Sequence, residues 1–419
     1  MAENTQRKEK MSSVQHVFII GAKSIGQYGG YETFVDKLTE QHQNDPAIQY
    51  HIACKANGDG SMDEAQLKNI EILKTNKDGT VSEFIYHNAH IFKIKCPQIG
   101  PAVAIYYDWK AFNYSINYCK VHQIEAPIFY VLTCRIGPFI SKLVKKVRSV
   151  KGKYYLNPDG HEWLRKKWSP LVRRYWKYSE GKMVKAADLV ICDSKNIEKY
   201  IKAEYHHPCT TFIAYGADIK PSCLSDDDSK FVNWLEEKKI ESGNYYLIVG
   251  RFVPENNYET MIREFMKSNT KRDLVIVTNL NTKLRTKLES ELHFSSDPRI
   301  KFVGTVYDKE LLKKIREKAF GYLHGHEVGG TNPSLLEALA STDINLLLDV
   351  GFNREVGENA AIYWTKENSS LSSIIDDTDR LNPKERELFS SRAKERINDD
   401  YNWTIIGDKY KKAWSTEDL

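Results

Sequence analysis

Short apolar runs alternate with helix-like stretches along the first half of this chain. An apolar run at residues 14–20 leads into a glycine-rich loop, and a helical pattern follows from residue 31 to about residue 42. Further apolar runs that resemble strands lie at residues 50–54, 90–95, 126–132, 153–156 and 186–194. Strands that alternate with helices predict a parallel α/β sheet.

The same alternation restarts after a polar stretch, KPSCLSDDDSK, at residues 220–230. The new set comprises strand-like runs at 245–249, 274–278, 300–303, 321–324 and 344–349, a helix near 258–268, and a charged helical stretch from about 383 to 414. We therefore predict an N-terminal domain at 1–215, a C-terminal domain at 216–395, and a helix within 396–419 that packs back towards the N-terminal domain. In sheets of this kind, ligands bind beyond the carboxyl ends of the strands.

Composition narrows the class of protein. A chain of 419 residues is too long for one ordinary domain, and 41% hydrophobic residues are enough for real cores. The net charge of +5 does not indicate a nucleic-acid partner. Seven scattered cysteines without a C-x-x-C pair are typical of reduced thiols. The polar first residues show no signal peptide and no apolar run is long enough to span a bilayer, so we predict a cytoplasmic protein whose membrane contact is peripheral.

The strongest local pattern is HGHEVGGTNPSLLEALAS at residues 324–341. Paired glycines, Gly329 and Gly330, precede Thr331 and the predicted N-cap Asn332, and a proline stands at the first helical position. The unpaired N–H groups of a helix N-terminus suit a diphosphate, and Glu337 could accept hydrogen bonds from ribose hydroxyls. An ordinary capped helix with a surface glutamate is the alternative.

Two other glycine patterns follow predicted strands. Arg251 comes after the strand at 245–249, where a guanidinium could bind phosphate oxygens in a forked geometry or form a surface salt bridge. The loop GAKSIGQYGG at residues 21–30 ends in Gly29 and Gly30 but contains no G-x-G-x-x-G in any register. This loop could hold a phosphate or a sugar acceptor, or it could be a tight turn.

Polar residues also cluster after the strand at 153–156, in the sequence LNPDGHEW. Asp159 and His161 could position sugar hydroxyls or act as acid and base groups, although a lone histidine is more often structural. No metal site is predicted, because the H-x-x-H at His87 and the H-x-H at His324 lack further ligands at a familiar spacing.

A basic and aromatic stretch follows directly. Aromatic rings favour a membrane interface and cations are drawn to anionic headgroups, which predicts a membrane-binding surface. A nucleic-acid site or a solvated helix face would use similar residues. The residues concerned are Trp163, Lys166, Lys167, Trp168, Arg173, Arg174 and Trp176.

With these motifs, nearly the whole chain resembles glycosyltransferase family four, the retaining GT-B enzymes. The similar elements are Gly-Arg at a strand end, AADLVICDS, YGAD and SLLEALAS. The runs IGAKSIGQYGGYETFVDKL and GGTNPSLLEALASTDINLLLDVGFNREVGENAA resemble bacterial rhamnosyltransferases of capsular and rhamnose-rich cell-wall polysaccharide synthesis.

The resemblance implies two Rossmann-like domains facing across a cleft. It also implies transfer of L-rhamnose, with retention and a β-1,4 linkage, from dTDP-β-L-rhamnose to glucose or N-acetylglucosamine on undecaprenyl diphosphate. No metal or other cofactor is implied, and the enzyme would work on the inner face of the plasma membrane. Arg251 and the loop from Gly329 to Asn332 would hold the diphosphate, Glu337 the ribose, and His161 or Asp159 would lie near the transferred sugar.

Two positions depart from the family pattern. Asn256 stands where many members have a lysine, and counting back eight positions from Glu337 gives Gly329 instead of a glutamate. Two alternatives therefore stay open: a transferase of the same fold that uses a UDP-hexose, and a non-catalytic protein that binds nucleotide sugars.

Overall fold

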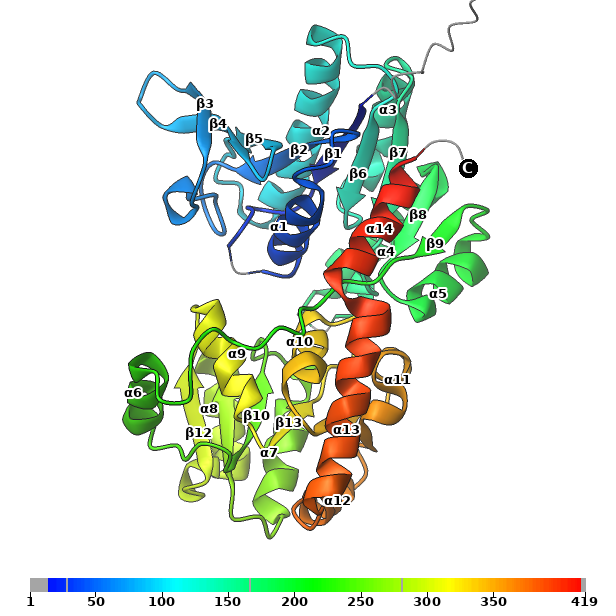
Figure 1. Ribbon diagram of the computed structural model, residues 1–419. Helices are drawn as coiled ribbons and strands as arrows, with labels where there is room; N and C mark the ends of the chain where they lie inside the picture. The colour runs from blue at the N-terminus through cyan, green and yellow to red at the C-terminus, as the bar shows by residue number, and fades with distance from the viewer. Residues whose placement is uncertain (1–13, 28, 166, 280–281, 416–419) are drawn as a thin grey trace, which may run out of the picture. The chain divides into compact units, whose positions relative to one another are not determined.

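The computed structural model describes residues 14–27, 29–165, 167–279 and 282–415 (Figure 1). By internal contacts the chain divides into two units. The first comprises Met1–Asn157, Lys185–Leu189 and Tyr410–Leu419, and the second comprises Pro158–Val184 and Val190–Lys409. The domain boundaries predicted at residues 215 and 395 stay a prediction.

The first sheet has nine strands in the order β3-β4-β5-β2-β1-β6-β7-β8-β9. Strand β1 pairs in parallel with β2 and with β6, as the alternation of strands and helices predicts. The strands are β1 (Gln15–Ile20), β2 (Ile48–Lys55), β3 (Glu71–Thr75), β4 (Val81–Tyr86), β5 (Ala89–Ile94), β6 (Ile128–Leu132), β7 (Lys153–Asn157), β8 (Leu189–Cys192) and β9 (Thr210–Phe212).

Strands β3, β4 and β5 form an antiparallel meander, which the sequence pattern did not predict. The turn between β4 and β5 is made by His87 and Asn88, which both adopt positive φ, the backbone conformation of a tight two-residue hairpin. Every residue of β3 is exposed, so this strand lacks the apolar alternation by which strands are recognised.

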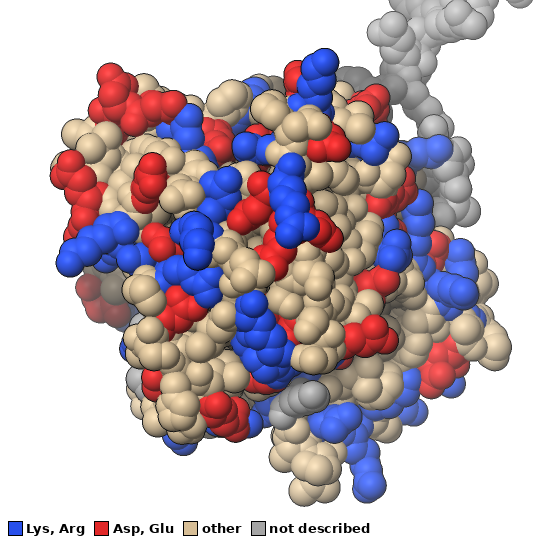
Figure 2. Space-filling view, turned by 90° about the horizontal axis from the view of Figure 1, so that it is seen from below, with Lys and Arg blue, Asp and Glu red and all other residues tan. Residues whose placement is uncertain are grey.

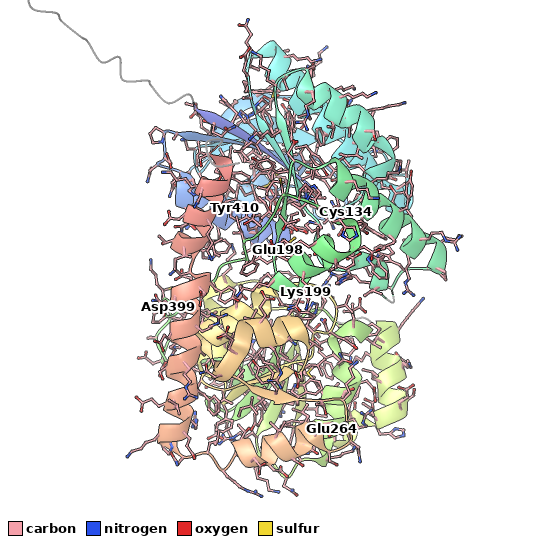
Figure 3. All side chains as sticks on the ribbon, turned by 90° about the vertical axis from the view of Figure 1, so that its right-hand side faces the viewer. Cys134, Glu198, Lys199, Glu264, Asp399 and Tyr410 are labelled. Atoms are coloured by element: carbon pink, nitrogen blue, oxygen red, sulfur yellow. The ribbon has the colours of Figure 1, made fainter. Side chains whose placement is uncertain are left out.

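Helices α1 (Gly30–His42), α2 (Val103–Val121) and α3 (Gly137–Arg148) belong to the first unit. The last turn of α14 (Trp403–Trp414) also belongs to it. There the Tyr410 hydroxyl, labelled in Figure 3, lies 3.0 Å from that of Tyr130, and Trp414 Nε1 donates to Tyr50 at 2.8 Å. The end of the chain thus contributes buried aromatic rings to the core of the first unit.

The second sheet has six parallel strands in the order β12-β11-β10-β13-β14-β15. Counted from β10, this is the 3-2-1-4-5-6 order of a Rossmann sheet, and the strand order reverses between β10 and β13. Apolar clusters cover both faces. The strands are β10 (Tyr245–Val249), β11 (Asp273–Val277), β12 (Ile300–Gly304), β13 (Gly321–His324), β14 (Asn345–Leu348) and β15 (Ile362–Trp364).

The remaining helices belong to the second unit, except that the last residues of α4 are assigned to the first unit. They are α4 (Pro170–Ala186), α5 (Lys195–Tyr205), α6 (Ser229–Lys238), α7 (Tyr258–Lys267), α8 (Thr282–Leu292), α9 (Lys309–Glu317), α10 (Pro333–Ser341), α11 (Gly351–Gly357), α12 (Ser370–Thr378) and α13 (Pro383–Arg396).

The helical stretch predicted from 383 to 414 is interrupted. A π-helical turn, Ile397–Tyr401, follows α13, and Asn402 is extended before α14 begins. The reason is a backbone pairing with a distant segment, because Ala217 N donates to Tyr401 O at 2.8 Å and Ala217 forms a β-bridge with Asn402.

Charges of both signs are mixed on the face of the molecule shown in Figure 2, without a broad area of one sign. Across the described ranges, no helix combines the length and the apolar character that a membrane span needs.

Candidate functional site

The loop between β13 and α10 carries the most specific sequence pattern. The Asn332 side chain accepts hydrogen bonds from Ser334 N at 2.9 Å and Leu335 N at 3.4 Å, and Pro333 is the first helical residue. The predicted N-cap is therefore confirmed. Because β13 adjoins β10, this helix begins beside the point where the strand order reverses, where Rossmann sheets bind ligands.

Gly329 and Gly330 lie where no side chain would fit. A Cβ atom on Gly330 would stand 2.1 Å from Asp193 Oδ1, and one on Gly329 would stand 2.9 Å from His326 Nε2. Gly160 packs on the same loop, since its own Cβ would fall 2.3 Å from the Gly329 Cα. The glycines thus allow three loops, which follow β7, β8 and β13, to approach one another closely.

Asp193, at the end of β8, is a residue that sequence reasoning did not single out. Its side chain is buried, Thr331 Oγ1 donates to its backbone carbonyl, and its Oδ1 lacks a hydrogen-bond partner among the described residues. Burial, together with the negative charges of Asp159 and Glu355, raises the pKa of Asp193 well above its usual range, although a hydrogen bond from Tyr215 opposes the shift. Burial therefore favours the neutral form of this carboxyl group.

Arg251 follows β10 and is exposed. Its backbone carbonyl accepts a hydrogen bond from Asn256 Nδ2 at 2.8 Å, and Asn256 Oδ1 lies 2.8 Å from His326 Nδ1. Over the described residues, Arg251 forms no ion pair within 4.0 Å, so the salt-bridge alternative finds no partner there. Arg251 stands at the carboxyl end of β10. Burial lowers the pKa of His326, in the loop that follows β13, and the positive charge of Arg251 contributes to this shift.

Glu337 lies on α10, one turn into the helix as predicted. Its Oε2 is 2.6 Å from Nη2 of Arg316, whose side chain is only 5% exposed, whereas that of Glu337 is 41% exposed. Arg316 also lies 3.4 Å from the Ser334 hydroxyl. One carboxylate oxygen of Glu337 is thus held by a buried arginine that sequence reasoning missed.

His161 and Asp159 follow β7. The His161 ring lies edge-on to Tyr200, with the ring centroids 4.3 Å apart, and burial followed by the positive charge of Lys177 lowers its pKa. Asp159 has a φ of 61°, a left-handed conformation that aspartate tolerates. His161 is therefore held as a neutral imidazole close to the loop of Gly160.

Gly29 and Gly30 belong to the first unit, unlike the other predicted site residues. Gly29 precedes the first residue of α1, and a Cβ atom there would lie 2.0 Å from Glu32 Oε2. Glu32 Oε1 accepts a hydrogen bond from Lys23 N at 2.9 Å. The alternative of a tight turn accounts for these contacts, and a ligand role for the two glycines stays a prediction.

Several side chains that were predicted to bind a membrane surface are half-buried or hydrogen-bonded within the second unit. Trp163, Trp168 and Trp176 are half-buried, and Arg173 Nε donates to the Trp163 carbonyl at 2.7 Å. The apolar side chains that α4 exposes are Leu171, at 77%, and Tyr178, at 51%. Lys166 lies outside the described residues, and Arg174 is exposed.

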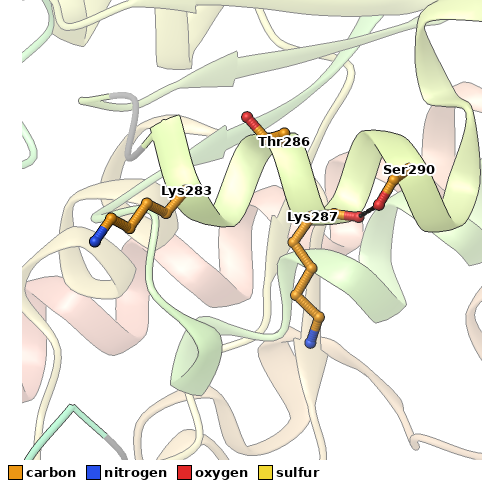
Figure 4. A pocket seen from close by; sticks show the side chains of 4 residues that line it. All are labelled: Lys283, Thr286, Lys287 and Ser290. Atoms are coloured by element: carbon orange, nitrogen blue, oxygen red, sulfur yellow. Dashed lines mark hydrogen bonds between the residues drawn. The ribbon is translucent and has the colours of Figure 1, made fainter.

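Within the part of the chain that the structure describes, no group of three or more His, Cys, Asp or Glu side chains is placed to hold a metal ion. One shallow hollow is lined by Lys283, Thr286, Lys287 and Ser290, all from α8 (Figure 4). None of the predicted site residues lines it.

One family of known proteins matches the first half of this chain. Residues 14–218 match a family described as a domain of unknown function, DUF1972. No curated protein matches this chain significantly.

Solved structures match over nearly the whole chain. HepE of Anabaena, in complex with UDP, is 12% identical with a TM-score of 0.66, covering 96% of this chain and 99% of HepE. A glycosyltransferase from Rickettsia africae is 12% identical with a TM-score of 0.68, covering 96% and 98%. Sucrose-phosphate synthase from Thermosynechococcus elongatus is 12% identical with a TM-score of 0.67, covering 96% and 98%. The predicted fold class, GT-B with two Rossmann-like domains, is confirmed, while the facing of the domains across a cleft stays a prediction.

Proposed function

We propose that this protein is a retaining glycosyltransferase that moves a sugar from a nucleotide donor to a lipid-linked acceptor. The observation that carries the proposal is the placing of Arg251 and the N-terminus of α10 at the carboxyl ends of the adjacent strands β10 and β13. A cation, the positive end of a helix dipole and the glycine loop that precedes the helix meet there, which suits a diphosphate. Solved structures with this fold include HepE bound to UDP and to UDP-glucose.

In this proposal the donor diphosphate lies on the second sheet. Arg251 and the N-terminus of α10 stabilise the charge that grows on the leaving diphosphate. Glu337 binds a hydroxyl of the donor's pentose through the carboxylate oxygen that Arg316 does not hold. No step needs a metal ion, because protein cations and amides supply the positive charge.

Asp159 and His161 lie near the transferred sugar in this proposal. Burial and the charge of Lys177 lower the pKa of His161. Its neutral ring can therefore accept a hydrogen bond from a sugar hydroxyl or donate one to it. The acceptor hydroxyl attacks from the face that the leaving group departs from, and the departing phosphate takes the proton, so the anomeric configuration is retained.

The donor we propose is dTDP-β-L-rhamnose. The acceptor is glucose or N-acetylglucosamine on a polyprenyl diphosphate, in the synthesis of a capsular or cell-wall polysaccharide. The support is the resemblance of the runs around Gly29 and Gly329 to rhamnosyltransferases. The exposed Leu171, Arg174 and Tyr178 would dock α4 on the inner face of the membrane, where this acceptor lies.

The test is transfer to synthetic lipid-diphosphate-glucose and lipid-diphosphate-N-acetylglucosamine, with dTDP-rhamnose or UDP-glucose and EDTA present. We expect a product heavier by one 6-deoxyhexose from dTDP-rhamnose, and no product with Arg251→Met. Product from UDP-glucose alone would overturn the donor, and dependence on added metal would overturn the metal-free reaction. Donor binding without any product would favour a non-catalytic binding protein.

A further inference from the structure

Helices α2 and α3 lie next to each other in the first unit. Helix α2 joins β5 to β6 and α3 joins β6 to β7, and all three strands run in the same direction in the sheet. Both helices therefore run opposite to the strands and parallel to each other. They pack together, and Lys146 Nζ donates to Asn113 Oδ1 at 2.7 Å across the contact. Their outer sides thus form one continuous surface.

Helix α3 has one buried face and one basic face. Its buried residues recur every three or four positions, as on one side of a helix. The opposite side carries Lys142, Lys145 and Lys146, which are exposed, and the sequence of α3 contains no acidic residue to balance them. The buried residues are Gly137, Ile140, Leu143 and Val147.

The positive charge of this surface is not neutralised by neighbouring side chains. Across the described residues, Lys142 and Lys145 form no ion pair within 4.0 Å, and neither does the exposed Lys110 on α2. Asp108 is the single acidic residue in the sequence of α2, and it is buried and pairs with Arg135 at 3.1 Å. The lysines therefore present their charge to solvent.

Aromatic side chains stand among these lysines. Phe139, in the first turn of α3, is 41% exposed, and Trp109 on α2 is 37% exposed. Because Asn113 contacts Lys146 and the helices are parallel, Trp109 and Lys142 lie one turn back from that contact on their respective helices. Phe139 lies about one further turn back along α3. Rings and lysines thus share one end of the surface.

This combination of residues suits an anionic membrane surface. Lysines are drawn to negatively charged headgroups, and exposed aromatic rings enter the boundary between the headgroups and the acyl chains. A soluble polyanion would use the lysines alone and would offer the Phe139 ring no apolar surroundings. The two residue types together therefore favour a lipid surface as the partner.

We propose that the outer side of α2 and α3 binds the surface of an anionic membrane. Phe139 and Trp109 enter the headgroup region, while Lys110, Lys142 and Lys145 contact the negative charges around them. This inference rests on the proposed function, in which the acceptor lies in a membrane, and it adds a contact made by the first unit to the one proposed for α4.

The test is sedimentation of the full chain with phosphatidylcholine vesicles that either contain or lack phosphatidylglycerol. We expect the wild type to bind the anionic vesicles, and less of it to bind as salt is added. Removing one lysine should weaken this binding about fivefold, so Lys142→Gln/Lys145→Gln should weaken it about 25-fold. Phe139→Ser should weaken it about tenfold, because the ring no longer leaves water.

Two controls come from the second unit. Lys283→Gln/Lys287→Gln removes the same charge from an exposed face of α8, and Leu388→Ser removes an apolar side chain that is 48% exposed on α13. Both should bind the vesicles as the wild type does. Melting temperatures equal to that of the wild type would show that the variants are folded.

The inference is overturned if Lys142→Gln/Lys145→Gln binds anionic vesicles within twofold of the wild type. It is also overturned if this variant loses binding to vesicles and to heparin equally while Phe139→Ser keeps full binding, because the surface would then serve a soluble polyanion. Loss of vesicle binding only on substitution of Leu171 and Tyr178 would leave α4 as the membrane contact and would overturn it as well.

Transfer assays separate this inference from the proposed function. With a short-chain, water-soluble lipid-diphosphate-glucose, the Lys142→Gln/Lys145→Gln variant should transfer sugar as fast as the wild type. With a long-chain acceptor in anionic vesicles, its rate should fall along with its binding. Absence of transfer by the wild type to either acceptor would overturn the proposed function, whereas vesicle binding by the wild type and its loss in the variant would still support the membrane contact.

Discussion

Arg316 holds one oxygen of Glu337. The guanidinium Nη2 lies 2.6 Å from Glu337 Oε2, and the arginine is buried while the glutamate is partly exposed. A carboxylate fixed in this way presents its other oxygen, Oε1, in a defined direction. Arg316 therefore acts as a positioning residue for a group that we propose binds the ribose of the donor.

Substitution of either partner should weaken nucleotide binding. We expect Glu337→Gln to lower the affinity for UDP about tenfold, and to affect dTDP less, because deoxyribose offers one hydroxyl fewer to the carboxylate. Arg316→Met should have a similar effect, since an unheld carboxylate no longer points to the sugar. Calorimetry on both single variants and on the double variant checks this. Losses that simply add in the double variant would show that the two residues act independently.

Trp414 should contribute strongly to the stability of the first unit. It is 1% exposed, and its Nε1 donates to Tyr50 at 2.8 Å. We expect Trp414→Ala to lower the free energy of unfolding by about 3–5 kcal/mol. Trp414→Phe keeps most of the apolar contact, but it leaves Tyr50 without this donor, so about 1–2 kcal/mol should be lost.

Trp109 on α2 is the matched control, because it is 37% exposed. Because part of its ring is in water, Trp109→Ala should lower the free energy of unfolding clearly less than Trp414→Ala does. Urea denaturation followed by circular dichroism measures all three variants. A Trp414→Ala variant as stable as Trp109→Ala would contradict the structural role of the chain end.

The fold could be predicted wherever a strand was buried on both faces or a helix had a recognisable cap. The run at Tyr245–Val249 is a strand as predicted, and Asn332 caps α10. Strand β3 could not be recognised, because all its residues are exposed. The break after α13 was equally hidden, since it depends on pairing with Ala217, a residue remote in sequence.

The residues of the candidate site could likewise be predicted only where the local sequence indicates their role. Arg251, Glu337 and the glycines stand in local patterns that have a chemical meaning, and these patterns could be read directly. Arg316 stands in no such pattern, and Asp193 stands in AADLVICDS, a run whose local chemistry assigned no role to this residue. Their roles arise only when the fold brings them to Glu337 and Gly330, and no property of the neighbouring residues in the sequence indicates those contacts.

Gly330 should tolerate no side chain. A Cβ atom would stand 2.1 Å from Asp193 Oδ1, so we expect Gly330→Ala to shift the loop and to lower the melting temperature by several degrees. Gly30 offers a control, because nothing lies within 4 Å of a Cβ built there. Differential scanning fluorimetry on Gly330→Ala and Gly30→Ala tests the contact, and equal melting temperatures would contradict it.

The charge state of Asp193 predicts a loss of stability with rising pH. Its folded-state pKa is raised above that of the unfolded chain, so the folded protein binds the additional proton. The resulting stability is full at low pH and is lost as the pH rises through the folded-state pKa. Asp193→Asn is neutral at every pH, and its free energy of unfolding should therefore fall less than that of the wild type as the pH rises from about 4, the pKa of an aspartate in the unfolded chain. Parallel pH profiles in urea would show that Asp193 does not titrate in this range.

A row of three histidines predicts that the free energy of unfolding falls as the pH drops, which is the opposite pH dependence to that expected from Asp193. His16 Nδ1 lies 2.9 Å from His51 Nε2, His51 Nδ1 lies 3.1 Å from His90 Nδ1, and His90 Nε2 lies 3.3 Å from Glu83 Oε2. Because a carboxylate only accepts hydrogen bonds, His90 Nε2 donates to Glu83, and each neutral ring in turn donates towards it. Burial is the first cause that lowers the pKa of each of the three rings.

In the unfolded chain these rings regain a pKa of about 6.5, so the unfolded state binds more protons below that pH. Stability should therefore fall as the pH drops from about 6.5, with a slope of up to about 1.4 kcal/mol per pH unit for His51. Phenylalanine can replace its ring, because His51 stacks on Phe18 with the centroids 4.2 Å apart. Between pH 7 and 5, the free energy of unfolding of His51→Phe, measured by urea denaturation, should fall less steeply than that of the wild type. His206→Gln, a substitution at an exposed site, should show the same dependence on pH as the wild type. An unchanged slope in His51→Phe would mean that the buried row does not control the acid stability of the first unit.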